Sequence, residues 1–193
     1  MINVIKNFKT SELTDTRFIH PVKVSFNLNG KDKTWEAVSS HDSVAILLYH
    51  EEKNAFLLVK QFRAPVYLND IEKTYTYELC AGLVDKDKSL IEIAKEEIDE
   101  ECGYDVNLTD IHKVTSFFTN VGISGGCQHL YFAKINESMK IHEGGGVNDE
   151  QIELYFLPIE KSDELIFDES KAKTPGLMFS FYWFLKNQEN LGL

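Results

Sequence analysis

The chain has 193 residues, of which 43% are hydrophobic and 12% aromatic, so it can bury the core of one domain with a small additional element. Its formal net charge of −11 argues against a binding surface for nucleic acid or an anionic membrane, because both require basic patches. Its apolar runs are too short to span a membrane, and the three cysteines lack a metal-binding spacing. With no signal-peptide pattern at the N-terminus, we expect a reducing, cytoplasmic location.

Two β-hairpins are predicted first along the chain. Residues 22–38 alternate apolar and polar side chains on either side of Asn29-Gly30, a favoured two-residue turn. The second hairpin joins strands at Val44–Tyr49 and Ala55–Val59. We expect residues 1–40 to form an N-terminal β element that mediates dimerisation, and residues 41–193 to form the main domain.

The remainder of the chain predicts more strands and a closing helix. Strands are expected at Lys113–Phe118, His129–Ile135 and Gln151–Leu157, and an amphipathic helix at Gly176–Asn187. Looser stretches, where the edges of active sites usually lie, are residues 69–73, 122–126 and 144–149. Mixed strands with a central and a C-terminal helix indicate an α/β (α+β) fold.

The most informative segment is GLVDKDKSLIEIAKEEIDEECGY, residues 82–104. Ser89 followed by Glu92 is a capping-box pattern, and Gly103 stands where a left-handed helix C-cap is expected. The segment therefore predicts a helix with known ends. Its buried stripe is expected from apolar residues that recur every four positions: Leu90, Ala94 and Ile98.

Three carboxylates meet near the end of this helix. Glu97 and Glu101 are i, i+4 neighbours and Glu100 is three residues after Glu97, so all three should share one patch. Like charges held together weaken a helix unless a cation neutralises them. Hard oxygen ligands of this kind suit Mg²⁺ or Mn²⁺. The alternative is a solvated acidic helix face.

This segment resembles the signature of the Nudix hydrolases, a glycine followed after fixed spacings by Glu, then by Arg-Glu-aliphatic-x-Glu-Glu-x-Gly-aliphatic. The resemblance implies the Nudix fold, a mixed β-sheet sandwiched between helices. It also implies Mg²⁺-dependent hydrolysis, with the helix glutamates and the backbone carbonyl of Ala81 as metal ligands. The matching positions are Gly82, Glu97, Ile98, Glu100, Glu101 and Gly103, with Tyr104 in place of the last aliphatic residue.

Two positions depart from the signature. Lys88 stands where the family has its first Glu, and Glu96 stands where it has Arg. In the family that pair forms a salt bridge between loop and helix. Because the charges are exchanged here, we expect the bridge to survive with reversed polarity.

Two residues outside the signature are candidates for contact with substrate. Arg63 follows a predicted strand, and its guanidinium could hold a diphosphate at two points. A surface ion pair is the alternative for Arg63. Glu78, in the strand before the signature, is a further acidic ligand or a residue that supports the ligands.

The glycine-rich loop GGGVNDEQIEL, residues 144–154, ends in acidic residues. In relatives that hydrolyse ADP-ribose and nucleotide sugars, a glutamate on this loop binds metal or activates water. Glu150 aligns best with it, Asp149 could substitute, and Glu153 falls inside a strand. The alternative is a loop that is acidic because it is exposed.

Two aromatic side chains are further candidates for contact with substrate. Trp35, on the first hairpin, could stack on a nucleobase or pack in a dimer interface, and both options remain open. His129 could line a pocket, but a structural histidine is favoured. The neighbours His41, Asp42 and Ser43 cannot face one another as a catalytic triad requires.

Segments beyond the signature resemble the UDP-sugar diphosphatases of the family. This resemblance implies a homodimer that hydrolyses UDP-glucose to UMP and glucose 1-phosphate. ADP-ribose-specific relatives carry a proline about sixteen residues past the signature, where this chain has Thr119, Asn120 and Val121. An ADP-ribose diphosphatase giving AMP and ribose 5-phosphate stays open, as does a non-catalytic nucleotide-sugar-binding module. The segments that carry the resemblance are HDSVAILLY, LLVKQFRAPVY, YELCAGLVD, EECGY and NVGISGG.

Overall fold

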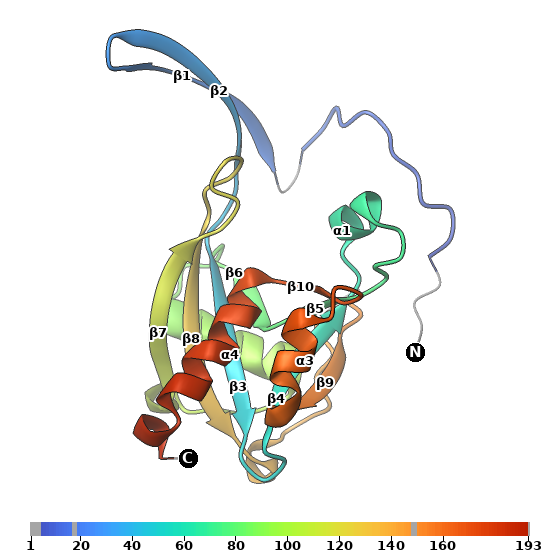
Figure 1. Cartoon of the computed structure of the whole chain (residues 1–193), viewed down its shortest axis with the longest axis vertical. Helices are drawn as coiled ribbons and strands as arrows, with labels where there is room; N and C mark the ends of the chain where they lie inside the picture. The colour runs from blue at the N-terminus through green and yellow to red at the C-terminus, as the bar shows by residue number, and fades with distance from the viewer. Residues whose placement is uncertain (1–4, 17–18, 148–149, 193) are drawn as a thin grey trace.

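The computed structural model describes residues 5–16, 19–147 and 150–192. A mixed β-sheet forms the body of the protein, helices cover both of its faces, and a two-stranded hairpin projects from one end (Figure 1). The predicted α/β architecture, with a separate N-terminal hairpin, is confirmed.

The projecting hairpin consists of β1 (His20–Leu28) and β2 (Lys31–Ser39), paired antiparallel. The turn between them has positive φ at both central residues, 55° at Asn29 and 79° at Gly30. These are the residue types that adopt left-handed backbone most readily, which is why this turn was predictable. The amide of Gly30 also donates to the Asn27 side chain at 3.0 Å.

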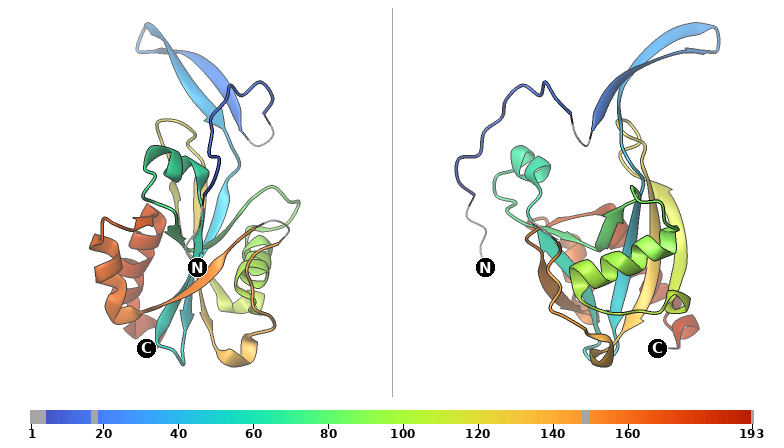
Figure 2. Two further views of the ribbon diagram at one scale, coloured as in Figure 1. Left: turned by 90° about the vertical axis from the view of Figure 1, so that its right-hand side faces the viewer. Right: turned by 180° about the vertical axis from the view of Figure 1, so that it is seen from behind.

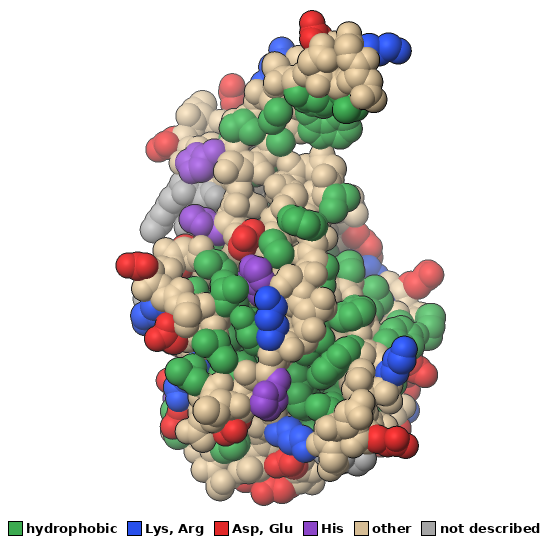
Figure 3. Space-filling view, turned by 90° about the vertical axis from the view of Figure 1, so that its left-hand side faces the viewer, with side chains coloured by type: hydrophobic (Ala, Val, Ile, Leu, Met, Phe, Trp, Pro, Cys, Tyr) green, Lys and Arg blue, Asp and Glu red, His purple; other side chains and the backbone are tan. Residues whose placement is uncertain are grey.

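One face of this hairpin is apolar and uncovered. Alternate residues of β1 share a face with the residues opposite them on β2, where Val22 pairs with Ala37 and Val24 with Trp35. The exposed fractions are 42% for Val24 and 56% for Trp35. Figure 3 shows green side chains gathered where the hairpin overhangs the body. The hairpin's apolar face, as we use the term, comprises Val22, Val24, Phe26, Leu28, Trp35 and Ala37.

The hairpin is attached to the body at its base. The indole Nε1 of Trp35 donates to the carbonyl of Gly122 at 2.9 Å, and the amide of Val38 donates to the carbonyl of Ile123 at 2.9 Å. Both carbonyls belong to the loop between β7 (Ile111–Phe118) and β8 (Cys127–Ile135), so that loop fixes how the hairpin leaves the sheet.

The main sheet has strand order β10-β5-β4-β3-β8-β7, with β6 added to β3 and β9 to β4. The central strand β3 is antiparallel to β4 and parallel to β8. The strands are β3 (Ser43–His50), β4 (Ala55–Gln61), β5 (Thr76–Glu78), β6 (Cys80–Leu83), β7 (Ile111–Phe118), β8 (Cys127–Ile135), β9 (Glu153–Pro158) and β10 (Ala172–Lys173).

A single stretch of chain, residues 76–83, joins two parts of the sheet. Its first half is β5, which pairs with β4, and after Leu79 its second half is β6, which pairs with β3. The sequence predicted only a strand around Glu78, before the signature; the change of partner at Leu79 is a tertiary effect without a local signal. This crossing brings both Glu78 and Ala81 into the lining of one cavity.

Helices cover the sheet on both sides (Figure 2). The helix α2 (Leu90–Glu97) lies on one face, whereas α3 (Ser162–Phe167) and α4 (Pro175–Asn187) lie on the other. The short α1 (Ala64–Asn69), like α3, had no clear sequence pattern. Short 3₁₀ segments occur at Leu108–Asp110, Glu137–Met139, Ile159–Lys161 and Glu189–Leu191.

Two apolar clusters hold these layers together. Ile46 on β3 packs in the cluster under α2, with Ile93 of that helix. Phe56 packs in the cluster under α4, where its ring stacks on Phe181 with centroids 4.6 Å apart. Each fully buried side chain of this size contributes about 1.5–3 kcal/mol, so both helical layers are tightly held.

The helix predicted from Ser89 to Gly103 has the expected ends. The Ser89 side chain and Glu92 form the capping box, and Gly103 has φ 77° in the left-handed region. Its last turn is not α-helical but π-helical, from Ile98 to Cys102. The wider turn was not predicted, and such turns are frequent at functional sites.

Two further findings concern the chain as a whole. In the described ranges, no helix is both long and apolar enough to cross a bilayer. All three cysteines are free: Cys80, Cys102 and Cys127.

Candidate active site

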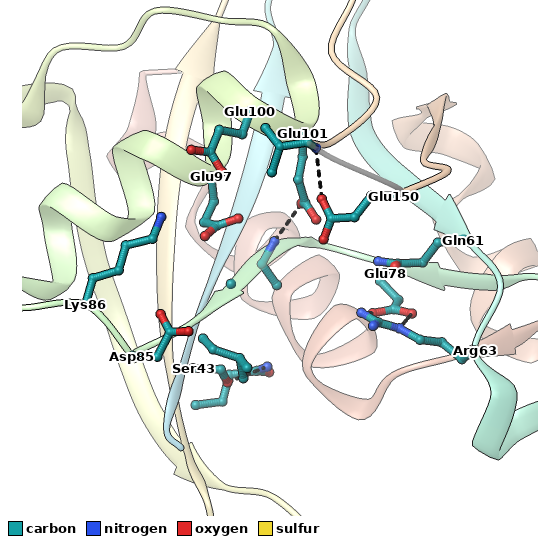
Figure 4. A pocket seen from close by; sticks show the side chains of 15 residues that line it. Ser43, Gln61, Arg63, Glu78, Asp85, Lys86, Glu97, Glu100, Glu101 and Glu150 are labelled. Carbon is teal, nitrogen blue, oxygen red and sulfur yellow. Dashed lines mark hydrogen bonds and ion pairs between the residues drawn. The ribbon is translucent and has the colours of Figure 1, made fainter. Parts of the chain in front are cut away.

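An open cavity of about 540 Å³ lies between the end of α2, the strands β4 to β6 and the loop before β9 (Figure 4). Its lining is strongly acidic and carries two cationic side chains, Arg63 and Lys86. The acidic residues among the described lining are Glu78, Asp85, Glu97, Glu100, Glu101 and Glu150.

Glu101 is the most deeply placed of the carboxylates, with 5% of the residue exposed. It projects from the π-helical turn, and its Oε2 accepts a hydrogen bond from the amide of Ala81 at 3.0 Å. Burial raises the pKa of Glu101 to about 8. A nearly buried carboxylate with a single backbone donor calls for a further positive charge.

Glu97 lies beside Glu101 and leans against the strand β6. A Cβ on Gly82 would come within 2.0 Å of the Glu97 Oε1, so the glycine of the signature is needed for this close approach. Burial, followed by the charge of Glu100, raises the pKa of Glu97 to about 7. The three predicted helix carboxylates therefore share one patch, as expected.

Glu150 reaches the same cavity from the opposite side. Its Oε2 accepts a hydrogen bond from the amide of Val147 at 3.0 Å, which folds the side chain back towards the glycine-rich loop. The prediction for Asp149 lies outside the described residues. Glu153 lies in β9, away from the cavity lining, and pairs with Lys60 at 2.7 Å.

Arg63 and Glu78 form a two-point ion pair at the other end of the cavity. The guanidinium donates from Nε to Oε1 and from Nη2 to Oε2, both at 2.8 Å. Glu78 is buried, and hydrogen bonding to it raises the pKa of Arg63, so the guanidinium stays charged. The sequence offered an ion pair and a place in the pocket as alternatives for Arg63, and the structure combines them.

The exchanged charges next to the helix do meet. Lys88 forms an ion pair with Glu96, and Lys86 joins them with its Nζ 3.2 Å from the same carboxylate. These contacts lower the pKa of Glu96, with the Lys88 hydrogen bond as the largest cause. The expectation that the family's loop-to-helix bridge survives with reversed polarity is confirmed as a contact.

The two aromatic candidates lie outside the described lining of the cavity. Trp35 is on the projecting hairpin, so a role in substrate binding stays a prediction. His129 bonds through Nδ1 to the Ser116 hydroxyl at 2.9 Å, which agrees with a structural role.

Polar residues at strand ends complete the cavity, and they were not predicted as site residues from the sequence. Gln61 ends β4, while Ser43 and Gln128 lie at the starts of β3 and β8. The Gln128 amide donates to the Ser43 hydroxyl at 3.3 Å. A single polar residue at the edge of an apolar strand was the only available signal, and it is too common to be specific.

The donor set fits a hard divalent cation. Four carboxylates, those of Glu97, Glu100, Glu101 and Glu150, face one cavity, and two of them have pKa values raised by burial. Oxygen-only ligands at the end of a rigid helix are typical of Mg²⁺ and Mn²⁺ sites, which also use substrate phosphates as ligands.

Comparison with known proteins agrees with this geometry. The model of the NUDIX domain family matches residues 39–175, more than half of the chain. The chain therefore belongs to the Nudix family, and it is a hydrolase that acts on diphosphate bonds.

The chain is also similar to individual members of the family. The chain is 32% identical to the uridine diphosphate glucose pyrophosphatase NUDT14 of Bos taurus, over 86% of this chain and 88% of the relative. It is also 32% identical to a GDP-mannose pyrophosphatase of Escherichia coli, over 86% of this chain and 87% of that protein. A GDP-mannose pyrophosphatase of Cronobacter sakazakii is 36% identical over 68% of this chain and 67% of its own length.

Proposed function

We propose that this protein hydrolyses the diphosphate bond of a nucleoside diphosphate sugar with the help of Mg²⁺, with UDP-glucose as the main candidate substrate. The products would be UMP and glucose 1-phosphate. The observation that supports the proposal best is the cavity itself, which joins buried carboxylates at one end to a fixed guanidinium at the other. A diphosphate needs both kinds of group, and the relatives named for nucleotide sugars share most of the chain.

The proposed role of each residue follows from its position in the cavity. Glu97, Glu100 and Glu101 would hold Mg²⁺, or Mn²⁺ in its place, together with the backbone carbonyl of Ala81. When bound, the cation supplies neutralisation of the phosphoryl charge and a more acidic water. Glu150 faces this cluster across the cavity and is the candidate base for the attacking water.

Arg63 would orient the substrate from the opposite end. Of its five N–H donors, two bond Glu78, which fixes the plane of the guanidinium before substrate arrives. The proposal assigns a further donor to a diphosphate oxygen. Glu78 thus acts through Arg63, and its pairing reduces the reorganisation needed on binding.

Product analysis identifies which nucleoside and which sugar the substrate contains. Purified protein with Mg²⁺ is assayed against UDP-glucose, GDP-mannose and ADP-ribose at equal concentration, and the nucleotide and sugar phosphates are identified. Release of UMP with the highest kcat/KM supports the main proposal. GDP-mannose is the second candidate because relatives of similar identity carry that name, and ADP-ribose is the third.

A non-catalytic binding module would behave differently. It would bind nucleotide sugars yet release no sugar phosphate with any divalent ion. The ion pair between Lys88 and Glu96 weighs against this alternative, because the departure from the family signature keeps the link between loop and helix.

We also propose a cytoplasmic homodimer in which a second copy covers the hairpin's apolar face. A two-stranded hairpin alone is marginal in water, and this one leaves Val24 and Trp35 about half exposed in a single chain. An interface built on the same surface of both copies is the usual arrangement of homodimers. The three free cysteines agree with a reducing compartment.

Two variants test the dimer. Deletion of residues 1–38 should give a monomer with a raised KM, as measured by light scattering and kinetics. In the full chain, Val24→Asp should do the same, while Ser25→Asp, one residue along and on the opposite face, should remain dimeric. A dimeric deletion variant would refute a dimer through the hairpin, and a monomer with unchanged KM would refute the predicted role of Trp35 in substrate binding.

A further inference from the structure

The loop that carries Glu150 is fastened to the end of the helix that carries the other carboxylates. The amide of Gly145 donates to the carbonyl of Glu101 at 2.8 Å, and the amide of Gly146 donates to the carbonyl of Glu100 at 3.1 Å. The same residues therefore present their side chains to the cavity and their carbonyls to the loop. Val147, directly after these glycines, donates from its amide to the Glu150 carboxylate at 3.0 Å, which couples the position of Glu150 to theirs.

This attachment depends on very close backbone approach. Gly144 has φ +67°, and a Cβ there would lie 2.4 Å from the carbonyl oxygen of Glu101. At Gly103 a Cβ would lie 2.1 Å from the carbonyl oxygen of His142, at φ +77°. Neither position has room for a side chain, so the loop can pack this closely on the helix end only with glycine at both positions.

A histidine and an aspartate close the attachment. His142 Nδ1 accepts a hydrogen bond from the amide of Gly144 at 3.0 Å, so the proton of the neutral imidazole lies on Nε2. Nε2 then donates to Asp99 Oδ1 at 2.7 Å. Asp99 belongs to the π-helical turn, between Glu97 and Glu100 in sequence. One imidazole thus bridges the loop backbone and the metal-binding turn.

Backbone contacts also hold the loop. Among the described residues, no helix or strand is formed between Lys140 and the start of β9. The amides of Ile141 and His142 donate to the carbonyl of Gly103 at 2.8 and 3.3 Å, and the amide of Ile152 donates to the carbonyl of Gly145 at 3.3 Å. The bridge through His142 adds a side-chain link to these contacts, and its two side chains are half exposed, 47% for His142 and 48% for Asp99.

We propose that Asp99 and His142 form a clamp that holds the Glu150 loop on the metal-binding helix, and that they are positioning residues for the reaction. Neither side chain is in the described cavity lining, so neither acts on the substrate directly. The role of the clamp in the reaction rests on the proposed function of Glu150. Its effect on the structure of the loop is independent of that function.

The test compares three aspartate variants of the full-length protein. Asp99→Ala removes the acceptor, and Asp99→Asn keeps an oxygen in the same place. Asp105→Ala is the matched control, because Asp105 also pairs with a partner, Lys95, at 2.6 Å beside the same helix but away from the loop. His142→Ala removes both contacts of the imidazole and serves if Asp99→Ala does not fold.

Two measurements are made on each variant. Amide hydrogen exchange at Gly145 and Gly146 should become about 2–5-fold faster in Asp99→Ala and His142→Ala, the size expected for a half-exposed ion pair, with the core strands unchanged. Their kcat should fall by a similar factor of about 2–5. KM and the Mg²⁺ dissociation constant from calorimetry should stay within about 1.5-fold. Asp99→Asn and Asp105→Ala should resemble the wild type in both measurements.

The outcomes separate the two hypotheses. Unchanged exchange at the glycine amides in Asp99→Ala and His142→Ala overturns the clamp, whatever the activity. Faster exchange with unchanged kcat overturns the positioning role and points against Glu150 as the base. If no nucleotide sugar is hydrolysed by the wild type, the proposed function fails, yet exchange still decides whether the clamp exists.

Discussion

Replacing Glu101 by glutamine should abolish turnover while making the metal-free protein more stable at neutral pH. The amide oxygen of glutamine can still accept the hydrogen bond from Ala81, so the local fold should survive. The charge needed for Mg²⁺ is lost. We expect kcat/KM to fall at least about 100-fold, beyond the effect of removing a supporting residue.

The stability change follows from the raised pKa. Burial raises the pKa of Glu101 from 4.5 to about 8 in the folded state. A folded-state pKa above the unfolded one gives stability that is complete at low pH and is lost as the pH rises towards about 8. The loss is about 1.4 kcal/mol per pH unit. From about pH 5.5 to about pH 7.5 the free energy of unfolding of the wild type should therefore fall by roughly 3 kcal/mol because of Glu101. The glutamine variant, which has no charge to gain at this position, should not show this fall.

Thermal unfolding in EDTA measures this difference. For a chain of this size 1 kcal/mol corresponds to about 2–4 °C in Tm, so the wild type should lose roughly 6–12 °C more than Glu101→Gln across that pH range. Glu160→Gln, an exposed glutamate outside the cavity lining, is the control and should follow the wild type. Equal pH dependence of wild type and Glu101→Gln would refute the buried-charge reasoning. More than about a tenth of the wild-type rate would refute the ligand assignment.

Three further changes test the loop and helix around these carboxylates. Lys88→Glu and Glu96→Arg should each lower activity and the double variant should recover it, with a coupling of about 0.2–1 kcal/mol in stability because the pair is exposed; zero coupling in a double-mutant cycle would make the charge exchange irrelevant. Gly82→Ala should displace the Glu97 carboxylate and lower kcat at least about tenfold, while Tm changes by less than about 3 °C; full activity would contradict the close packing seen here. Lys86→Met removes a cation from the cavity lining, so the Mg²⁺ dissociation constant from calorimetry should fall, and a rise would show that Lys86 helps to order the site.

Local signals made the hairpins and the main helix predictable. The Asn29-Gly30 turn, the alternation along β1 and β2, and the capping box at Ser89 each act over a few residues. The strands β3, β4, β7, β8 and β9 were predicted within two residues at each end. The helix signature also predicted which carboxylates would meet, because their spacing fixes them on one face.

Features that depend on distant parts of the chain were not predictable. The division of residues 76–83 between two partner strands, the π-helical turn at Ile98–Cys102 and the short α1 have no periodic signal of their own. The Arg63–Glu78 pairing joins residues fifteen apart in sequence, and no local pattern favours that partner. Likewise Asp99 and His142 meet only because the glycine loop folds back onto the helix.

The way the cavity is built from the chain has an evolutionary consequence. The end that we propose for the cation takes Ala81, Glu97, Glu100 and Glu101 from one contiguous stretch, whereas the end around Arg63, Gln61 and Gln128 is assembled from separate strands. If the second end recognises the substrate as we propose, mutation can remodel recognition one strand end at a time without disturbing the carboxylates. Relatives of this chain that share about a third of its residues carry the names of different sugar nucleotides. A lineage built this way can diversify its substrates while inheriting a single reaction.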